Sequence, residues 1–213
     1  FSELRLILAE ENPVPAMVRI NDFNLLQVIH PSIRLDKRLI DKLNAVKKVV
    51  SWYDLLYLGE GYMRWSVYFL VLISHDNRVE ADQICERFEL PPRLRRMLIE
   101  EREQAERALK GLGRSTQDNA AVYRQLDGFK IELILYMMAI SRQQAAKRAI
   151  SLYFTSLRQV TTALKGKDLI DLGLKPGPIF KEVLQAVQDA KLNGQLKTPE
   201  DEIQYARYYV DNR

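Results

Sequence analysis

The stretch DKRLIDKLNAVKKVVSWYDLLY, residues 36–57, shows the pattern that decides the fold class. Its apolar side chains recur mostly three or four residues apart, which is the spacing of one face of an α-helix. Asp36 stands where an N-cap is expected, and Gly59 and Gly61 follow where such a helix should end. The stretch therefore predicts a long helix with one buried face. The apolar positions are Leu39, Ile40, Leu43, Val46, Val50, Tyr53 and Tyr57.

Helical periodicity continues on both sides of this stretch. Sustained alternation of apolar and polar residues, the pattern of strands, is absent from the sequence. We therefore expect an all-α, multi-helical fold of about nine to eleven helices with no sheet. A final helix should be capped by Thr198, with Pro199 in its first turn. The other expected helices cover about 64–73, 79–88, 92–112, 119–126, 129–140, 141–164 and 179–192.

Composition excludes several classes of protein. Hydrophobic residues make up 47% of the 213 residues and charged residues 28%, which is ordinary for a globular chain and too apolar for a disordered one. The one cysteine, Cys85, cannot form an internal disulfide, so we expect a cytoplasmic protein. The longest apolar runs, 65–73 and 133–140, fall short of the roughly 20 residues that cross a bilayer, so no membrane partner is expected.

No catalytic residues and no metal site are predicted in this chain. His75 and Asp76 match the core of a histidine–aspartate hydrolase signature, which His30 upstream and an Asp downstream could formally complete. They stand at the end of a predicted helix, however, where Asp and Asn commonly form turns and caps. The acidic run 200–202 falls in the first turn of a predicted helix, where the helix dipole already explains it. A metal-dependent hydrolase stays as an alternative interpretation.

Positive charge is concentrated in one part of the chain. The whole sequence has a formal net charge of +4. Residues 133–167 contain no acidic side chain and carry a net charge of +6, which leaves −2 for the rest. Projected on a single helix over 141–164, Lys147, Arg158 and Lys165 fall on one face. Lysine and arginine bind phosphate oxygens, so this face predicts contact with a polyanion, with a merely solvated face as the alternative.

The turn that follows adds a second feature. Residues 166–178, GKDLIDLGLKPGP, predict a short helix, a glycine exit, and a new helix that starts at Gly177 and Pro178. Gly173 and Gly177 would let the backbone approach an anion closely, and a helix start offers unpaired N–H groups. Lys167 and Lys175 flank the turn. A tight helix–helix turn without a ligand would need the same glycines, so both interpretations stay open.

This motif, followed by LNGQLKT at 192–198, resembles the C-terminal segment of the tRNA nucleotidyltransferase/poly(A) polymerase family, which includes the bacterial CCA-adding enzymes. The start of the chain agrees, with FSEL at 1–4 and the pairs Asn12-Pro13 and His30-Pro31. Residues 36–140 match only as generic body helices. One departure follows the P-G-P, where many relatives have a glycine and this chain has Ile179-Phe180-Lys181.

The resemblance implies an enzyme with a catalytic head and a helical neck, body and tail. It assigns 1–35 to the end of the neck and the entry to the body, 36–114 to the body, and 115–213 to the tail. Because the chain starts with Phe1 and lacks the motifs of the head, we expect the head to precede it and this part alone to be inactive. Mg²⁺ with ATP or CTP is expected in that head and no cofactor in this chain. The choice between CCA addition, A addition and poly(A) synthesis stays open.

The predicted function is therefore to bind tRNA or another structured RNA and to position it for the head. The alternative is a helical protein-interaction or dimerisation module that binds no RNA, and formation of a homo-oligomer stays open. Arg93, Arg95 and Arg96 lie close together on the 92–112 helix and suit either function. The predicted RNA-binding residues are Lys147, Arg158, Lys165, Lys167, Lys175, Gly173 and Gly177.

Overall fold

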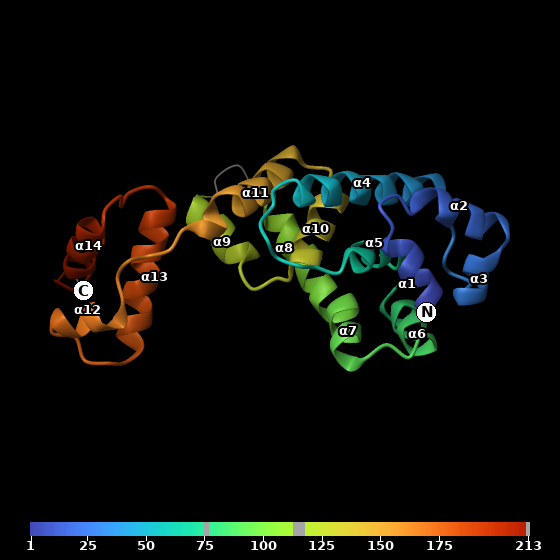
Figure 1. Ribbon diagram of the computed structural model, residues 1–213. Helices are drawn as coiled ribbons and strands as arrows, with labels where there is room; N and C mark the ends of the chain where they lie inside the picture. Colours follow the sequence, from blue (N-terminus) through green and yellow to red (C-terminus); the bar gives the residue numbers. More distant parts are fainter. Residues whose placement is uncertain (75–76, 113–117, 212–213) are drawn as a thin grey trace. The chain divides into compact units, whose positions relative to one another are not determined.

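The computed structural model describes residues 1–74, 77–112 and 118–211 (Figure 1). These residues form helices and connecting segments without a strand, so the all-α prediction is confirmed. The helical segments outnumber the nine to eleven expected, since several expected helices are accompanied by short ones. No helix in the described ranges is both long and apolar enough to cross a membrane.

The chain forms two compact units, and each is described by itself. The first unit comprises Phe1–Gly113 and Gly128–Lys147, and the second comprises Arg114–Asp127 and Arg148–Arg213. In the first unit α10 packs against both α4 and α5, and α1 packs against α5. The helices of the first unit are α1 Ser2–Ala9, α2 Val14–Asp22, α3 Leu25–Ile29, α4 Lys37–Asp54, α5 Arg64–Leu72, α6 Arg78–Arg87, α7 Pro92–Arg96, η1 Met97–Glu101, α8 Arg102–Leu112 and α10 Ile131–Ile140.

The helix predicted from the opening stretch is α4. Its N-cap is Asp36, whose side chain accepts the Leu39 backbone N–H at 2.8 Å. Its buried face contains the apolar residues Leu39, Leu43, Val46, Val50 and Tyr53, together with Val49. The helix ends at Asp54, before the glycines, and the next residues form an irregular connection to α5.

The helix predicted over 92–112 is confirmed and contains a π-helical turn. It runs through α7, η1 and α8, and η1 is the π turn. Before this turn, Arg95 pairs with Asp82 of α6. After it, the buried Arg102 donates to the Ile73 carbonyl oxygen at 2.7 Å. Side chains on both sides of the π turn therefore bind defined partners.

The second unit is built around α13. This helix packs against both α9 and α14. The Asn119 side chain at the start of α9 donates to the Leu192 carbonyl oxygen at 3.0 Å. This hydrogen bond joins the start of α9 to the end of α13. The core residues of this unit are Leu164, Leu169, Val183, Val187, Ala190, Leu196 and Ala206. Its helices are α9 Asn119–Leu126, η2 Leu157–Gln159, α12 Gly166–Asp171, α13 Pro178–Leu192 and α14 Pro199–Asp211.

The single long helix predicted over 141–164 is wrong. The helix found there, α11, covers Gln144–Thr155, and the division into units falls within it, after Lys147. Leu157 and Leu164 keep a spacing close to helical and are buried, but they lie on η2 and on the extended segment after it. In this segment the backbone N–H groups of Ala163 and Leu164 bind the Glu202 side chain of α14 instead of helical carbonyl groups. Apolar spacing alone therefore predicted burial correctly and helix length incorrectly.

Candidate nucleic-acid interface

The segment that leads into α12 is held by Glu202. The side chain of Glu202 is fully buried. Its Oε2 accepts the backbone N–H groups of Ala163 at 2.7 Å and Leu164 at 2.9 Å. Its Oε1 pairs with the Lys191 ammonium of α13 at 2.5 Å. The buried carboxylate is thus fully engaged, and it fixes the backbone immediately before the predicted basic residue Lys165.

The first turn of α12 is closed by the aspartate of the G-K-D motif. Asp168 Oδ2 accepts the Lys165 backbone N–H at 2.7 Å, and the Asp168 N–H donates to the Lys165 carbonyl oxygen at 3.0 Å. Gly166 lies against the ring of Phe180, which a Cβ on the glycine would meet at 3.7 Å. Asp168 therefore serves the fold, while the side chains of Lys165 and Lys167 are exposed to solvent.

The two glycines predicted to matter differ in conformation. Gly173 has φ +85° at the exit of α12, in the left-handed region that strains other residues. Gly177 is extended, with φ 171°, and a Cβ there would meet only the Lys175 carbonyl oxygen, at 3.9 Å. The turn thus needs a glycine at 173 for its backbone, whereas the backbone and neighbours of 177 would accept a side chain. The short helix, glycine exit and new helix at Pro178 are as predicted.

The lysines around this turn lack acidic partners. Lys165, Lys167 and Lys175 are exposed, and none of them pairs with an acidic side chain in the described part of the chain. Many cations of the first unit differ, because they are used in ion pairs. These pairs include Arg64–Asp54, Arg78–Glu103, Arg95–Asp82 and Lys130–Glu101. The three lysines of the turn therefore expose positive charges that stabilise no ion pair within the described residues.

Arg158 and Lys147 lie in other surroundings. The Arg158 guanidinium carbon lies 5.7 Å from the centroid of the Phe154 ring, so this side chain packs on an aromatic face. Burial raises the pKa of the neighbouring Tyr153 to about 12. Lys147 is half-buried on α11 in the first unit, whereas Arg158 belongs to the second. The predicted alignment of Lys147, Arg158 and Lys165 on one helix is therefore wrong, and their contact with RNA stays a prediction.

The residues considered for a metal hydrolase give that interpretation no support. His75 and Asp76 lie outside the described residues. The His30 ring nitrogens lie 2.7 Å from the Ser32 hydroxyl and 3.1 Å from the Gln83 side-chain oxygen. In the ranges that the structure describes, no three His, Cys, Asp or Glu side chains gather in a group that could hold a metal ion. Cys85 is buried, and burial raises the pKa of its thiol to about 11.

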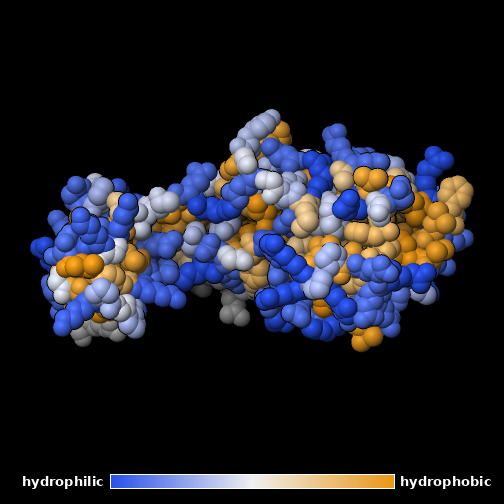
Figure 2. Space-filling model, turned by 60° about the horizontal axis from the view of Figure 1, so that its bottom comes forward, coloured by the Kyte–Doolittle hydropathy of each residue, from blue (hydrophilic) through white to orange (hydrophobic). Residues whose placement is uncertain are grey.

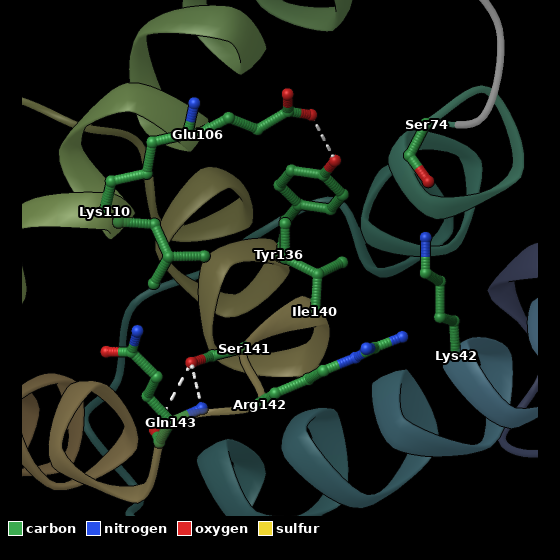
Figure 3. A pocket seen from close by; sticks show the side chains of 10 residues that line it. Lys42, Ser74, Glu106, Lys110, Tyr136, Ile140, Ser141, Arg142 and Gln143 are labelled. Carbon is green, nitrogen blue, oxygen red and sulfur yellow. Dashed lines mark hydrogen bonds between the residues drawn. The ribbon is translucent and has the colours of Figure 1, made fainter. Parts of the chain in front are cut away.

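No pattern in the sequence predicted the pocket of the first unit that Figure 3 shows. It brings together Lys42 of α4, Lys110 of α8 and Arg142, which follows α10. Of these three residues, Arg142 is the one with a signal in the sequence, because it lies in the stretch 133–167 that contains no acidic side chain. Lys42 and Lys110 stand in ordinary mixed-charge helices, where no local pattern distinguishes them.

Comparison with curated proteins finds relatives with one function. The chain is 38% identical over 216 residues to the A-adding tRNA nucleotidyltransferase of Geobacter sulfurreducens, a match that covers 99% of this chain and 24% of that protein. It is 24% identical over 190 residues to the A-adding tRNA nucleotidyltransferase of Aquifex aeolicus, covering 89% of this chain and 22% of that protein. The chain thus spans about a quarter of the length of these relatives. No family model matches the sequence.

Solved structures share the fold. The Thermotoga maritima CCA-adding enzyme complexed with tRNA_CCA superposes with a TM-score of 0.77 at 20% identity, covering 98% of this chain and 50% of that one. A CCA-adding enzyme in apo form II gives a TM-score of 0.77 at 20% identity, covering 100% and 49%. At this identity the likeness establishes the fold, and the sequence matches establish the kinship. The chain is therefore a homologue of the tRNA nucleotidyltransferases, with the helical fold found in about half of the CCA-adding enzyme chain.

Proposed function

We propose that this chain binds tRNA, or another structured RNA, and positions it for nucleotide addition at the RNA 3′ end by a nucleotidyltransferase head. The observation that carries the proposal is the exposed set Lys165, Lys167 and Lys175, which has no acidic partner in the described part of the chain. The kinship with A-adding tRNA nucleotidyltransferases supports an RNA ligand. So does the fold shared with an enzyme solved in complex with tRNA_CCA.

The chemistry of the turn suits an RNA backbone. Lysine ammonium groups bind phosphate oxygens and release the counterions condensed on the RNA. Glu202 and Asp168 fix the backbone around Lys165, which limits the entropy lost when its side chain becomes ordered on a ligand. An RNA held in this way presents its 3′ end in a fixed place. The chain would therefore contribute to catalysis by positioning the RNA, without transferring a proton itself.

The nucleotide chemistry is assigned to the head. In the proposed whole enzyme Mg²⁺ with ATP or CTP supplies the reacting phosphates. The described residues of this chain include no cluster of carboxylates that could hold Mg²⁺. Because the curated relatives are A-adding enzymes, A addition is the favoured reaction of the head, and a cytoplasmic location is part of the same proposal.

Binding of a tRNA transcript at several salt concentrations tests the proposal. The variant Lys165→Gln/Lys167→Gln/Lys175→Gln should bind at least tenfold more weakly at about 0.1 M salt. Its slope of log affinity against log salt should be shallower by about 2 to 3, since each lost phosphate contact removes about 0.7 to 0.9. The control Lys37→Gln/Lys47→Gln/Lys48→Gln makes the same charge change on α4 and should keep most of the affinity. Equal effects of the two triple variants would refute the assignment to the turn.

A protein-interaction module is the second candidate function, and the surface of the first unit favours it. Leu6, Phe23, Leu25 and Val28 on or beside α1–α3 are each at least half exposed. Figure 2 shows apolar side chains gathering at the end of the first unit that holds α2 and α3. Sedimentation of the chain at rising concentration separates the candidates. Self-association that Phe23→Ser abolishes, together with non-saturating retention of RNA, would favour the interaction module.

A further inference from the structure

The pocket around Lys42, Lys110 and Arg142 has more basic than acidic side chains in its lining. It has a volume of about 400 Å³ and lies entirely within the first unit. Figure 3 shows Arg142 reaching across the pocket toward Lys42, which rises from α4 beside Ser74. Lys110 lines another side, and Glu106 is the one acidic residue of the described lining. Three cations and one carboxylate give the lining a formal charge of +2.

Glu106 already serves two groups of the fold. It accepts the Tyr136 hydroxyl at 2.6 Å, and Tyr136 is fully buried. It also lies 4.0 Å from the Nε atom of Arg102, whose side chain is buried. Burial and the Glu106 charge raise the pKa of Tyr136. The carboxylate therefore stabilises a buried phenol and a buried guanidinium, and it also attracts Lys42 of the pocket.

Lys42 and Arg142 repel each other across this space. Burial lowers the pKa of Lys42 from its usual value. The charge of Glu106 opposes this lowering more strongly than the charge of Arg142 adds to it, and Asp36 also opposes it. An anion placed between Lys42 and Arg142 would relieve this repulsion. A guanidinium and an ammonium that face one space suit an oxyanion with two free oxygens, because each cation can bind one of them.

We propose that this pocket binds a phosphate group between Lys42 and Arg142. In the RNA-binding function proposed above, on which this part rests, the group is a phosphodiester of the RNA backbone. A phosphodiester carries one negative charge and two free oxygens, and the lining has two positive charges in excess. The pocket is thus a phosphate site of the first unit, in addition to the lysines of the second.

The first experiment measures tRNA binding at several salt concentrations. The variant Lys42→Gln/Arg142→Gln should bind about tenfold more weakly, with a slope of log affinity against log salt that is shallower by about 0.7 to 0.9 for one phosphate. The matched control Lys37→Gln/Arg38→Gln removes one lysine and one arginine from the exposed first turn of α4, outside the pocket. Losses of equal size in both variants would overturn the proposal. The thermal unfolding of each variant is recorded to show that it is folded.

The second experiment titrates inorganic phosphate and follows the Arg142 side-chain Nε–H signal by NMR. The wild-type chain should show a saturable shift, and the Lys42→Gln variant should weaken it. A linear, non-saturating shift would overturn the phosphate site. Saturation by phosphate with unchanged tRNA affinity in the double variant would overturn the RNA backbone as its source and indicate a free phosphate compound. Failure of the wild-type chain to bind tRNA would refute the proposed function, whereas saturation by phosphate would still support the site.

Discussion

The carboxylate of Glu202 on α14 accepts the backbone N–H of Leu164, 38 positions earlier in the chain, at 2.9 Å. The same oxygen binds the N–H of Ala163, and the other oxygen pairs with Lys191. One buried side chain thus determines where the backbone runs before the first lysine of the candidate interface. Stability of the second unit and presentation of Lys165 are therefore coupled through Glu202.

Glu202→Ala should lower the free energy of unfolding by about 3 kcal/mol. The substitution leaves two backbone N–H groups, of which that of Leu164 is buried, without an acceptor and a partly buried ammonium without its partner. Urea unfolding followed by circular dichroism measures this loss. Glu200→Ala is the control, since Glu200 lies in the same helical turn but is exposed, and its change should stay within about 0.5 kcal/mol. Equal losses in the two variants would contradict the role given to Glu202.

Gly173→Ala and Gly177→Ala should have different effects. Alanine at 173 must adopt φ near +85°, which costs about 1 to 2 kcal/mol of folding free energy. Alanine at 177 keeps an extended backbone and ordinary contacts, so unfolding should change by less than about 0.5 kcal/mol. If RNA approaches the backbone at 177, as predicted, Gly177→Ala should weaken tRNA binding while the fold stays stable. Unchanged binding by this variant would remove Gly177 from the interface.

Cys85 should react with thiol reagents only when the protein unfolds. Its side chain is buried, and burial raises the thiol pKa to about 11, so the reactive thiolate is scarce at pH 8. Modification by Ellman's reagent should be slow in buffer and rapid in urea above the unfolding midpoint. Rapid modification of the native chain at pH 8 would show that the helices around Cys85 open more easily than the packing indicates.

Lys42 should make stability depend on pH in the alkaline range. Its pKa is lower in the folded than in the unfolded chain, so between these two values the unfolded state binds more protons. Stability contributed by Lys42 therefore rises with pH across this window, and below it the charged lysine destabilises the fold. Lys42→Gln should remove this rise. The difference in urea midpoint between wild type and variant, measured from pH 8 to 10.5, should shrink as the pH increases. A difference that stays constant would show that Lys42 has an ordinary pKa.

Features set by neighbouring residues were predictable from the sequence. The caps at Asp36 and Thr198 bind N–H groups three residues later, at 2.8 Å and 3.1 Å, so the sequence contains both partners within one turn. The turn at Gly173 is local in the same sense, since its N–H binds the Ile170 carbonyl oxygen. Helix starts and the all-α class follow from such short-range rules.

Features set by distant residues were not predictable. The early end of α11 at Thr155 accompanies an extended segment that Glu202 binds from α14, while Glu202 itself fitted the pattern of a simple first-turn acid. The pocket around Lys42, Lys110 and Arg142 depends on the packing of three separate elements. A charge pattern along the chain locates cations in sequence, but only tertiary packing decides which of them meet.

The π turn at Met97–Glu101 has an evolutionary consequence. Such a turn contains one residue more than an α-helical turn, so the helix holds an extra residue while the helical segments before and after it stay continuous. Deleting one residue there should restore an ordinary α-helical turn and leave Arg102 directed at the Ile73 carbonyl oxygen. Homologues with one residue fewer in this helix should therefore keep an arginine and a glutamate at the positions of Arg102 and Glu106, because the register after the turn is preserved.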